Sequence, residues 1–506
     1  MTVAELVGRR LVFGLPGPDL TDADVRLFRE TEAGGVILYR RNLRSPEGVV
    51  RLVSDLEAAL DRRLLVTTDH EGGRVVMLGE AVTIFPDGLA AGAAGDPDLV
   101  ERQGRIEGRE LRRLGVDLSF APVLDVLGPG YSPNIGIRAY GTDPARVAVL
   151  GAARIRGLQA SGVSACAKHF PGQGLAPVDA HVDLPMIDAG WAEMHATHLV
   201  PFRAAIGAGV DALMTSHPLY PRLDPAPRTP ATFSRRLVTD FLRQEVGYQG
   251  LVVSDDLEMG AVRKLASVGE ASARAAAAGH DLLLVCHSED AQRAAYAALI
   301  EADRAGVLPR RESEASRARI DGLVGRRASR VEGGPPRGEP DGPALARELA
   351  GRAARVVAGT SRLPFADPGE TVVAVFPRLS TLAARITVEA AMLDEAAYVR
   401  ELCGGLALRV EVVGVEPEGP EIARAAAAVR EANAALLFLY DAHLYPSNRA
   451  LLDAVQDAAR RLAVVLMRDP WDADWLHPGV VGVTAFGWRR CQLEAALACL
   501  APITER

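Results

Sequence analysis

Ser164-Ala165-Cys166-Ala167-Lys168-His169-Phe170-Pro171-Gly172-Gln173-Gly174 is the stretch of this chain that best reveals its fold. A short apolar run ends in Lys168 and His169, and a turn rich in Gly and Pro follows. The segment Asp179-Ala180-His181 comes shortly afterwards. Polar side chains at the end of a buried strand, followed by such a loop, are typical of a functional site carried by a rigid scaffold.

Similar apolar segments recur through the first two thirds of the chain, with helical segments such as 97–114 and 143–161 between them. We expect eight strands, at 11–15, 35–39, 64–68, 118–124, 164–169, 212–216, 250–254 and 282–286. Eight strands alternating with helices predict a (β/α)8 TIM-like barrel over residues 1–330. A doubly wound open sheet is the alternative, but it would carry a Gly-rich phosphate turn after its first strand, and Leu15-Pro16-Gly17-Pro18 is not one.

A linker is expected at residues 331–343, where the run Gly333-Gly334-Pro335-Pro336 and the prolines after it exclude a helix or strand. A charged helical stretch, 310–330, precedes it. Beyond the linker, strand candidates at 371–376, 408–413, 435–440, 462–467 and 480–485 alternate with helices. They predict a smaller α/β domain, an αβα sandwich with a mostly parallel sheet, over residues 344–506. Asp441 and His443 follow its third strand, but we find no complete set of catalytic residues there. We therefore expect a structural or dimerising domain.

Composition excludes several classes of protein. The net charge of −8 over 506 residues argues against a nucleic-acid surface. The five cysteines are scattered and form no CxxC pair, so neither a disulfide framework nor a zinc knuckle is indicated. The chain has no signal-peptide pattern and no apolar run of about 18 residues. We expect a cytoplasmic protein with no membrane and no nucleic-acid partner.

Ionisable residues follow most of the predicted barrel strands. In a barrel these strand ends converge on one face, where the active site lies. Any one of these residues could cap a helix, but so many ionisable side chains at one end of the barrel indicate a catalytic site. They are Asp69, His70, Glu71, Asp125, Lys168, His169, His217, Asp255, Asp256 and His287.

Several kinds of catalysis are disfavoured at this rim. Metal catalysis would be signalled by His-x-His on the first strand or by HExxH, and a serine nucleophile by GxSxG; the sequence contains none of them there. We therefore expect no metal and no cofactor. Schiff-base chemistry needs a neutral lysine, whereas the acids near Lys168 favour its charged form, which would donate hydrogen bonds to a hydroxylated ligand.

Glycosyl transfer is the remaining option, and it needs a carboxylate at the anomeric carbon and a proton donor for the leaving oxygen. Asp255 is the carboxylate candidate. Because adjacent strand residues point in opposite directions, we expect Asp256 to be the N-cap of the following helix instead. In an extended loop Asp179 and His181 point the same way, so the carboxylate can orient the imidazole, whose ordinary pKa of about 6.5 suits an acid and base near neutrality.

Seven motifs resemble glycoside hydrolase family 3, specifically the two-domain form of its β-N-acetylglucosaminidase branch. They stand in the family's order over roughly residues 8 to 300. The motifs are Gly34-Gly35-Val36-Ile37-Leu38, Thr68-Asp69-His70-Glu71-Gly72-Gly73-Arg74-Val75, Phe120-Ala121-Pro122-Val123-Leu124-Asp125-Val126, Ile135-Gly136-Ile137-Arg138-Ala139-Tyr140, Lys168-His169-Phe170-Pro171-Gly172-Gln173-Gly174, Asp179-Ala180-His181 and Ser254-Asp255-Asp256-Leu257-Glu258-Met259.

The resemblance implies a role for each matching residue. Asp255 would be the nucleophile of a retaining double displacement, and His181 the general acid/base with Asp179 as its partner. The residues implied to hold the sugar are Asp69, Arg138, Lys168 and His169. The resemblance leaves Asp125 undecided, and we expect Arg74 to form a structural salt bridge.

Two positions depart from the family pattern. Gln173 stands where the family's loop usually has His, and Met77 stands where members often have an Arg that contacts the sugar.

Three hypotheses remain open. The first is an exo-β-N-acetylglucosaminidase, monomeric or homodimeric, acting on muropeptides or chitooligosaccharides. The second is a phosphorylase, since a neutral His does not repel phosphate as a carboxylate would. The third is a sugar-binding protein that has lost catalysis.

Overall fold

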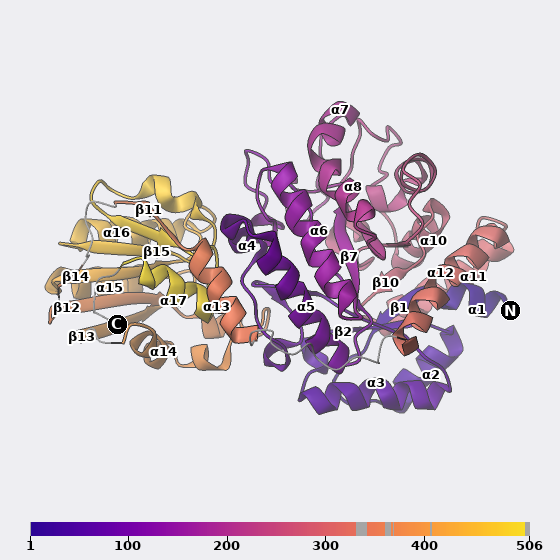
Figure 1. Cartoon of the computed structure of the whole chain (residues 1–506), viewed down its shortest axis with the longest axis horizontal. Coiled ribbons are helices and arrows are strands. Elements are labelled where there is room, and N and C mark those ends of the chain that lie inside the picture. Colours follow the sequence, from indigo (N-terminus) through magenta and orange to yellow (C-terminus); the bar gives the residue numbers. More distant parts are fainter. Residues whose placement is uncertain (1, 330–341, 360–365, 368, 405–406, 501–506) are drawn as a thin grey trace. The chain divides into compact units, whose positions relative to one another are not determined.

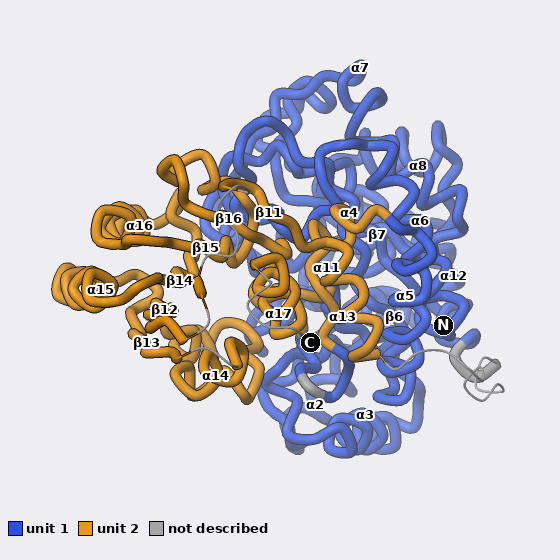
Figure 2. The backbone as a smooth tube through the Cα atoms, turned by 60° about the vertical axis from the view of Figure 1, so that its left-hand side comes forward, with its two compact units in different colours: residues 1–71, 77–83, 96–339 blue, residues 72–76, 84–95, 340–506 orange. Residues whose placement is uncertain are grey.

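A computed structural model describes residues 2–329, 342–359, 366–367, 369–404 and 407–500. The chain forms two compact units, shown in different colours in Figure 2. Unit 1 consists of Met1–Glu71, Met77–Thr83 and Asp96–Glu339, and unit 2 of Gly72–Val76, Ile84–Gly95 and Pro340–Arg506. The expected linker at 331–343 lies outside the described residues except for its last two positions, which open a helix. The domain boundary therefore stays a prediction.

Unit 1 contains a closed barrel of eight parallel strands, in the order β10-β1-β2-β3-β6-β7-β8-β9. A parallel bridge between Val253 and Leu282 joins the last strand of this order to the first. The strands are β1 (Leu11–Gly14), β2 (Gly35–Leu38), β3 (Leu65–Thr68), β6 (Leu118–Ser119), β7 (Ser164–Phe170), β8 (Ala212–Thr215), β9 (Leu251–Val253) and β10 (Leu283–Val285). The (β/α)8 prediction is confirmed.

The fourth barrel strand is shorter than the sequence predicts. We expected 118–124, and the regular strand β6 ends at Ser119. Backbone hydrogen bonds to β7 nevertheless continue to Leu124: the carbonyls of Ala121 and Pro122 accept from Cys166 and Lys168, and the N–H of Leu124 donates to the Lys168 carbonyl. Pro122 has no N–H to give to the ladder, so the pairing is irregular over this part of the predicted strand.

Helices surround the strands (Figure 1). Two predicted helices form almost as expected, α5 (Pro97–Arg113) capped by Asp96 and α6 (Pro144–Ala160) capped by Asp143. The others include α1 (Val3–Gly8), α2 (Asp22–Thr31), α3 (Pro46–Leu60), α8 (Leu199–Gly207), the π-helical η6 (Arg236–Glu245), α10 (Val268–Ala278) and α11 (Glu289–Arg304). Alternate strand residues such as Val12 and Ile37 fill the barrel interior, while neighbours such as Phe13 and Val36 pack beneath the helices.

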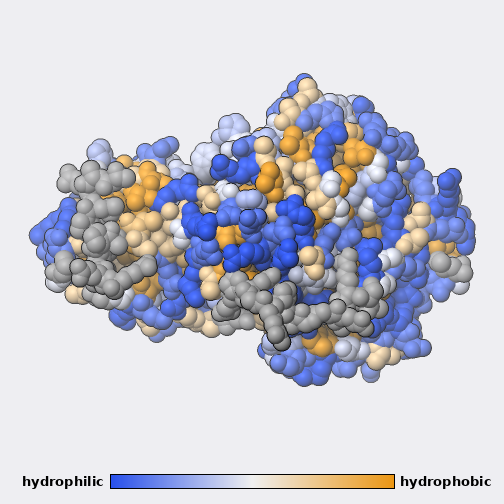
Figure 3. All heavy atoms as spheres, in the orientation of Figure 1, coloured by the Kyte–Doolittle hydropathy of each residue, from blue (hydrophilic) through white to orange (hydrophobic). Residues whose placement is uncertain are grey.

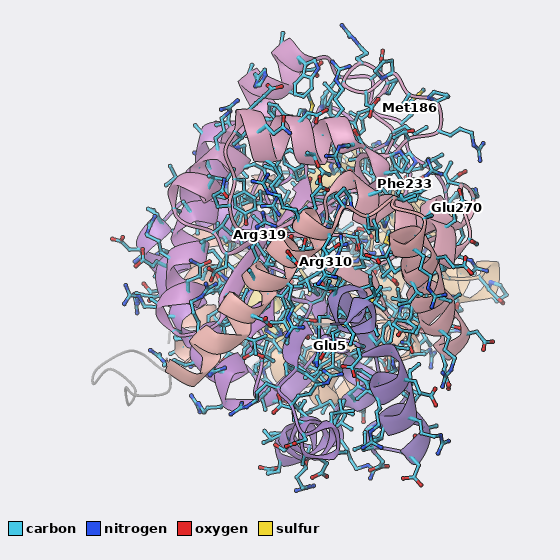
Figure 4. The ribbon with its side chains drawn as sticks, turned by 90° about the vertical axis from the view of Figure 1, so that its right-hand side faces the viewer. Glu5, Met186, Phe233, Glu270, Arg310 and Arg319 are labelled. Atoms are coloured by element: carbon cyan, nitrogen blue, oxygen red, sulfur yellow. The ribbon has the colours of Figure 1, made fainter. Side chains whose placement is uncertain are left out.

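The last helix of unit 1, α12 (Arg310–Ser329), lies against the amino-terminal ends of the strands. Ile320 and Leu323 join the core inside the barrel. Arg319, labelled in Figure 4, donates a 2.8 Å hydrogen bond to Asp281, which lies just before β10. This helix covers one end of the barrel and leaves the carboxyl ends of the strands for the site.

Unit 2 is an α/β sandwich around a six-stranded sheet with the order β11-β16-β15-β14-β12-β13. All pairs are parallel except β11–β16, which is antiparallel. The strands are β11 (Arg355–Ala358), β12 (Thr371–Pro377), β13 (Ala407–Val413), β14 (Ala434–Leu439), β15 (Leu462–Leu466) and β16 (Val481–Thr484). The five predicted strands are present. The sequence missed β11, an edge strand in which Arg355 is exposed and the other residues are half-buried.

Two separate cores, one on each face of this sheet, make unit 2 a three-layer structure. One core packs α14 (Glu395–Leu402) and α17 (Arg490–Ala498) against the sheet, and the other packs α15 (Gly419–Glu431) and α16 (Pro446–Ala458). Two further helices, α13 (Gly342–Ala353) and α4 (Gly88–Ala94), belong to the same unit. The guanidinium of Arg489 donates two hydrogen bonds, of 2.8 and 2.7 Å, to the carbonyl of Gly73. The αβα prediction is confirmed.

No helix within the described ranges is long and apolar enough to cross a membrane. The face in Figure 3 carries mostly hydrophilic side chains with apolar residues scattered among them.

Candidate active site

The Asp179–His181 pair forms as the sequence predicts, on the long loop that follows β7. One carboxylate oxygen of Asp179 accepts hydrogen bonds from the backbone N–H of His181 (2.9 Å) and from its ring Nδ1 (2.8 Å). The bond fixes the proton on Nδ1 and leaves Nε2 for a reaction partner. The His181 side chain is 61% exposed, so a ligand can reach it.

The loop that carries this pair is fastened to the segment that follows Asp255. The backbone N–H of Ala261 donates to the carbonyl of Ala180 (3.0 Å), and Lys264 pairs with Asp183 at 2.6 Å. Gly260 lies so close that a Cβ there would meet the His181 carbonyl oxygen at 2.4 Å. The acid/base candidate and the nucleophile candidate are therefore held on adjoining backbone.

Lys168 and Asp69 meet through an ion pair that a second acid completes. Lys168 Nζ lies 2.6 Å from Asp69 Oδ1 and 2.6 Å from Glu71 Oε1, and the lysine side chain is only 3% exposed. Burial opposes the charge on Lys168, but the two carboxylates outweigh it and raise the lysine pKa. Lys168 is therefore a permanent hydrogen-bond donor, which excludes Schiff-base chemistry at neutral pH.

Glu71 is a candidate site residue that the sequence placed at the rim without a role. Its carboxylate accepts two 2.8 Å hydrogen bonds from Arg138 as well as the bond from Lys168. Burial opposes its ionisation, yet the charges of Arg138 and Lys168 hold the pKa of Glu71 well below its usual range. The sequence signal for Glu71 was its position in the motif that follows β3. Its pairing with Arg138 and Lys168 could not be predicted, because those two residues come from distant segments of the chain.

Asp125, left undecided by the sequence, is fully buried and orients His169. It accepts from His169 Nδ1 at 2.7 Å and from the backbone N–H of Gln173 at 2.7 Å. The ring's other nitrogen, Nε2, lies 3.4 Å from an Arg138 nitrogen. Asp69, Arg138, Lys168 and His169 thus form one connected group, and Asp125 is a support beneath it.

The two candidate catalytic residues have pKa values shifted in the directions that acid/base and nucleophilic roles would require. Burial disfavours the charged form of Asp255, but His217, His169 and Lys168 outweigh it and lower its pKa. The hydrogen bond that His181 donates to Asp179 raises the pKa of His181 above its ordinary value. Near neutrality Asp255 is ionised and His181 holds a proton more readily than a free histidine.

Asp256 does not cap the following helix, which corrects the prediction. Helix α9 (Gly260–Arg263) begins later, after Met259, and Asp256 caps the intervening turn by accepting from the N–H of Glu258 (3.1 Å). His217 follows the carboxyl end of β8, as expected, and is buried with its Nε2 3.0 Å from the Asp256 carbonyl oxygen. It supports the backbone next to Asp255.

The two departures from the family pattern differ in burial. Gln173 is only 2% exposed, and within the described residues its Nε2 meets no hydrogen-bond acceptor. Met77 is half-buried.

Known proteins resemble the chain in both sequence and structure. The model of the glycosyl hydrolase family 3 N-terminal domain matches residues 12–323. A β-hexosaminidase of Stenotrophomonas maltophilia strain K279a is 40% identical over 296 residues, which are 57% of this chain and 86% of the relative. A β-hexosaminidase of Pseudomonas aeruginosa strain LESB58 is 40% identical over 293 residues, which are 57% of this chain and 86% of the relative. The structure of a family 3 β-N-acetylglucosaminidase from Paenibacillus sp. str. FPU-7 has a TM-score of 0.89 at 32% identity and covers 99% of this chain and 97% of its own.

A (β/α)8 barrel with carboxylates and a histidine at the carboxyl ends of its strands, similar to these enzymes along most of its length, is a glycoside hydrolase. The chain belongs to glycosyl hydrolase family 3.

Proposed function

We propose that this protein is a retaining exo-β-N-acetylglucosaminidase that removes terminal β-linked GlcNAc from muropeptides or chitooligosaccharides. The observation that carries the proposal is the Asp179–His181 pair, fastened by the Ala180–Ala261 hydrogen bond to the segment after Asp255. The β-hexosaminidase and β-N-acetylglucosaminidase names of its relatives support the substrate class.

In the first step, ionised Asp255 attacks the anomeric carbon while His181 gives its proton to the leaving oxygen. The lowered pKa of Asp255 keeps it an anion, and the raised pKa of His181 keeps it protonated further into neutral pH. The C–O bond of the glycoside breaks as the ester bond to Asp255 forms.

In the second step, neutral His181 takes a proton from water, whose oxygen attacks the anomeric carbon and displaces Asp255. Asp179 stabilises the imidazolium that forms in this step, as it does before the first proton transfer. Two inversions at one carbon give net retention of configuration.

The connected group beneath the reacting residues would hold the sugar. Lys168 and Arg138 are donors fixed by Glu71, and Asp69 is 21% exposed and offers a carboxylate to hydroxyl groups. His169, oriented by Asp125, supplies a further polar contact. These groups are ordered before substrate arrives, so binding costs little side-chain entropy.

Turnover of a chromogenic aryl β-GlcNAc tests the proposal. Asp255→Ala should lose the activity and regain part of it with azide, which enters where the carboxylate is missing and gives the α-glycosyl azide. Asp240→Ala, at an exposed carboxylate on η6, is the matched control and should keep full activity. Full activity in Asp255→Ala would overturn the assignment of the nucleophile.

Phosphate buffer supplies a second arm of the same assay. Hydrolysis predicts free GlcNAc as the product with and without phosphate, whereas GlcNAc-1-phosphate would make the protein a phosphorylase. Binding of GlcNAc with no turnover of any β-GlcNAc substrate would make it a sugar-binding protein.

We further propose a cytoplasmic monomer or homodimer that acts on small carbohydrates and has no nucleic-acid partner.

A further inference from the structure

Unit 2 contains a second cluster of ligand-type side chains, at the carboxyl edge of its parallel sheet. Asp441 and His443 follow β14, and Asp469 follows β15. One ligand atom from each of these three residues lies within 4.8 Å of the others. Ligands of open α/β sheets bind at this edge, outside the carboxyl ends of the strands.

His443 is oriented as a metal-binding histidine usually is. Its Nδ1 donates to Asp472 at 2.9 Å, and the same carboxylate accepts the backbone N–H groups of Ala442 and His443, each at 2.8 Å. A carboxylate bonded to one ring nitrogen fixes the tautomer and presents the other nitrogen as a ligand. That other nitrogen, Nε2, lies 3.7 Å from Asp469.

Asp469 is a buried carboxylate that lacks hydrogen-bond donors. It is 4% exposed, and within the described part of the chain neither of its oxygens accepts a hydrogen bond. Buried polar groups are rarely left in this state, because the lost hydration is not replaced.

The charges around the cluster favour a cation. Three carboxylates, those of Asp441, Asp469 and Asp472, surround His443, and Arg468 pairs with one oxygen of Asp441. A cation bound between these carboxylates would supply the partner that Asp469 lacks.

We infer that Asp441, His443 and Asp469 bind a divalent transition-metal ion of the Zn²⁺ type in unit 2. One imidazole and two carboxylates, with an open fourth position for water, form a ligand set that suits zinc. Zinc–ligand bonds of about 2.1 Å place tetrahedral ligands about 3.4 Å apart. Side-chain movements on the order of 1 Å would close the cluster around the ion.

Calorimetric titration of the full chain with ZnCl₂, after removal of metal by a chelator, tests the inference. Because Asp179 and His181 also carry ligand atoms, all titrations use a His181→Gln background. We expect one zinc per chain in that background. Adding His443→Gln or Asp469→Asn should weaken binding at least tenfold, while adding His477→Gln, at an exposed histidine of the same unit, should leave it unchanged.

Two results would overturn the inference: no zinc binding in the His181→Gln protein, or unchanged binding when either cluster substitution is added. Circular dichroism establishes that each variant is folded. Co²⁺ provides a second readout, because the visible bands of a tetrahedral nitrogen and oxygen site should appear in the His181→Gln protein and disappear with His443→Gln. This test is independent of glycosidase activity, so its outcome does not depend on the proposed function.

Discussion

Gly260 is the position where one added methyl group should separate acid catalysis from nucleophilic attack. A Cβ at residue 260 would lie 2.4 Å from the carbonyl oxygen of His181 and 3.2 Å from that of Val182. Ordinary van der Waals contact begins near 3.4 Å, so the loop carrying His181 must move by about 1 Å. Because misplacing a catalytic group by this distance costs about 100-fold in rate, we expect Gly260→Ala to lose about 2.7 kcal/mol of transition-state stabilisation.

The assay compares kcat/KM for two β-GlcNAc substrates. A chitooligosaccharide needs a proton on its leaving oxygen, whereas a dinitrophenyl glycoside leaves without one. Gly260→Ala should therefore lose about 100-fold on the oligosaccharide and far less on the dinitrophenyl substrate.

The matched control is Gly322→Ala, in helix α12, where a Cβ would meet nothing within 4 Å. Activity there should be unchanged, with stability raised by about 0.5–1 kcal/mol. The reasoning is refuted if Gly260→Ala is folded and cleaves the oligosaccharide at the wild-type rate, or if both substrates lose activity equally.

Three further changes test the supports of the site and of the barrel. Asp179→Asn removes the carboxylate that raises the pKa of His181, so the alkaline limb of the kcat/KM profile should move to lower pH; an unmoved limb contradicts the pairing. Glu71→Gln leaves buried Lys168 with less opposing charge and should cost about 3 kcal/mol in urea unfolding together with a large loss of kcat/KM; unchanged stability would show that the pair is not coupled. Gly157→Ala places a Cβ 2.2 Å from a backbone oxygen of α5 and should cost about 1–3 kcal/mol of thermal stability without changing KM; an equally stable variant would contradict the close packing of α5 and α6.

The barrel was predictable because its strands are short, apolar and regularly spaced, and because helical segments separate them. Tertiary detail changed the ends of elements: the fourth strand is regular only to Ser119, and α9 starts at Gly260, beyond the turn that Asp256 caps. Strand β11 was missed because its apolar run, Val356-Val357-Ala358, is too short to show the period of a strand.

Contacts within the candidate site were predictable between residues close in sequence and not between residues from distant segments. The i, i+2 spacing of Asp179 and His181 is enough to pair them. Glu71 pairs with two cations from other segments, Lys168 and Arg138. The residues next to Glu71 in the sequence do not predict this pairing. The cluster in unit 2 is similar, since Asp469 comes from a different strand end than the residues it meets.

The most direct test of the central claim is to trap the glycosyl-enzyme. Incubation with a 5-fluoro-N-acetylglucosaminyl fluoride, which slows the second step more than the first, should add one sugar mass to the intact protein. Proteolysis and mass spectrometry should locate that mass on Asp255. A label on Asp256 or Glu258, or an active enzyme that accumulates no covalent adduct and releases product with inverted configuration, would contradict the account.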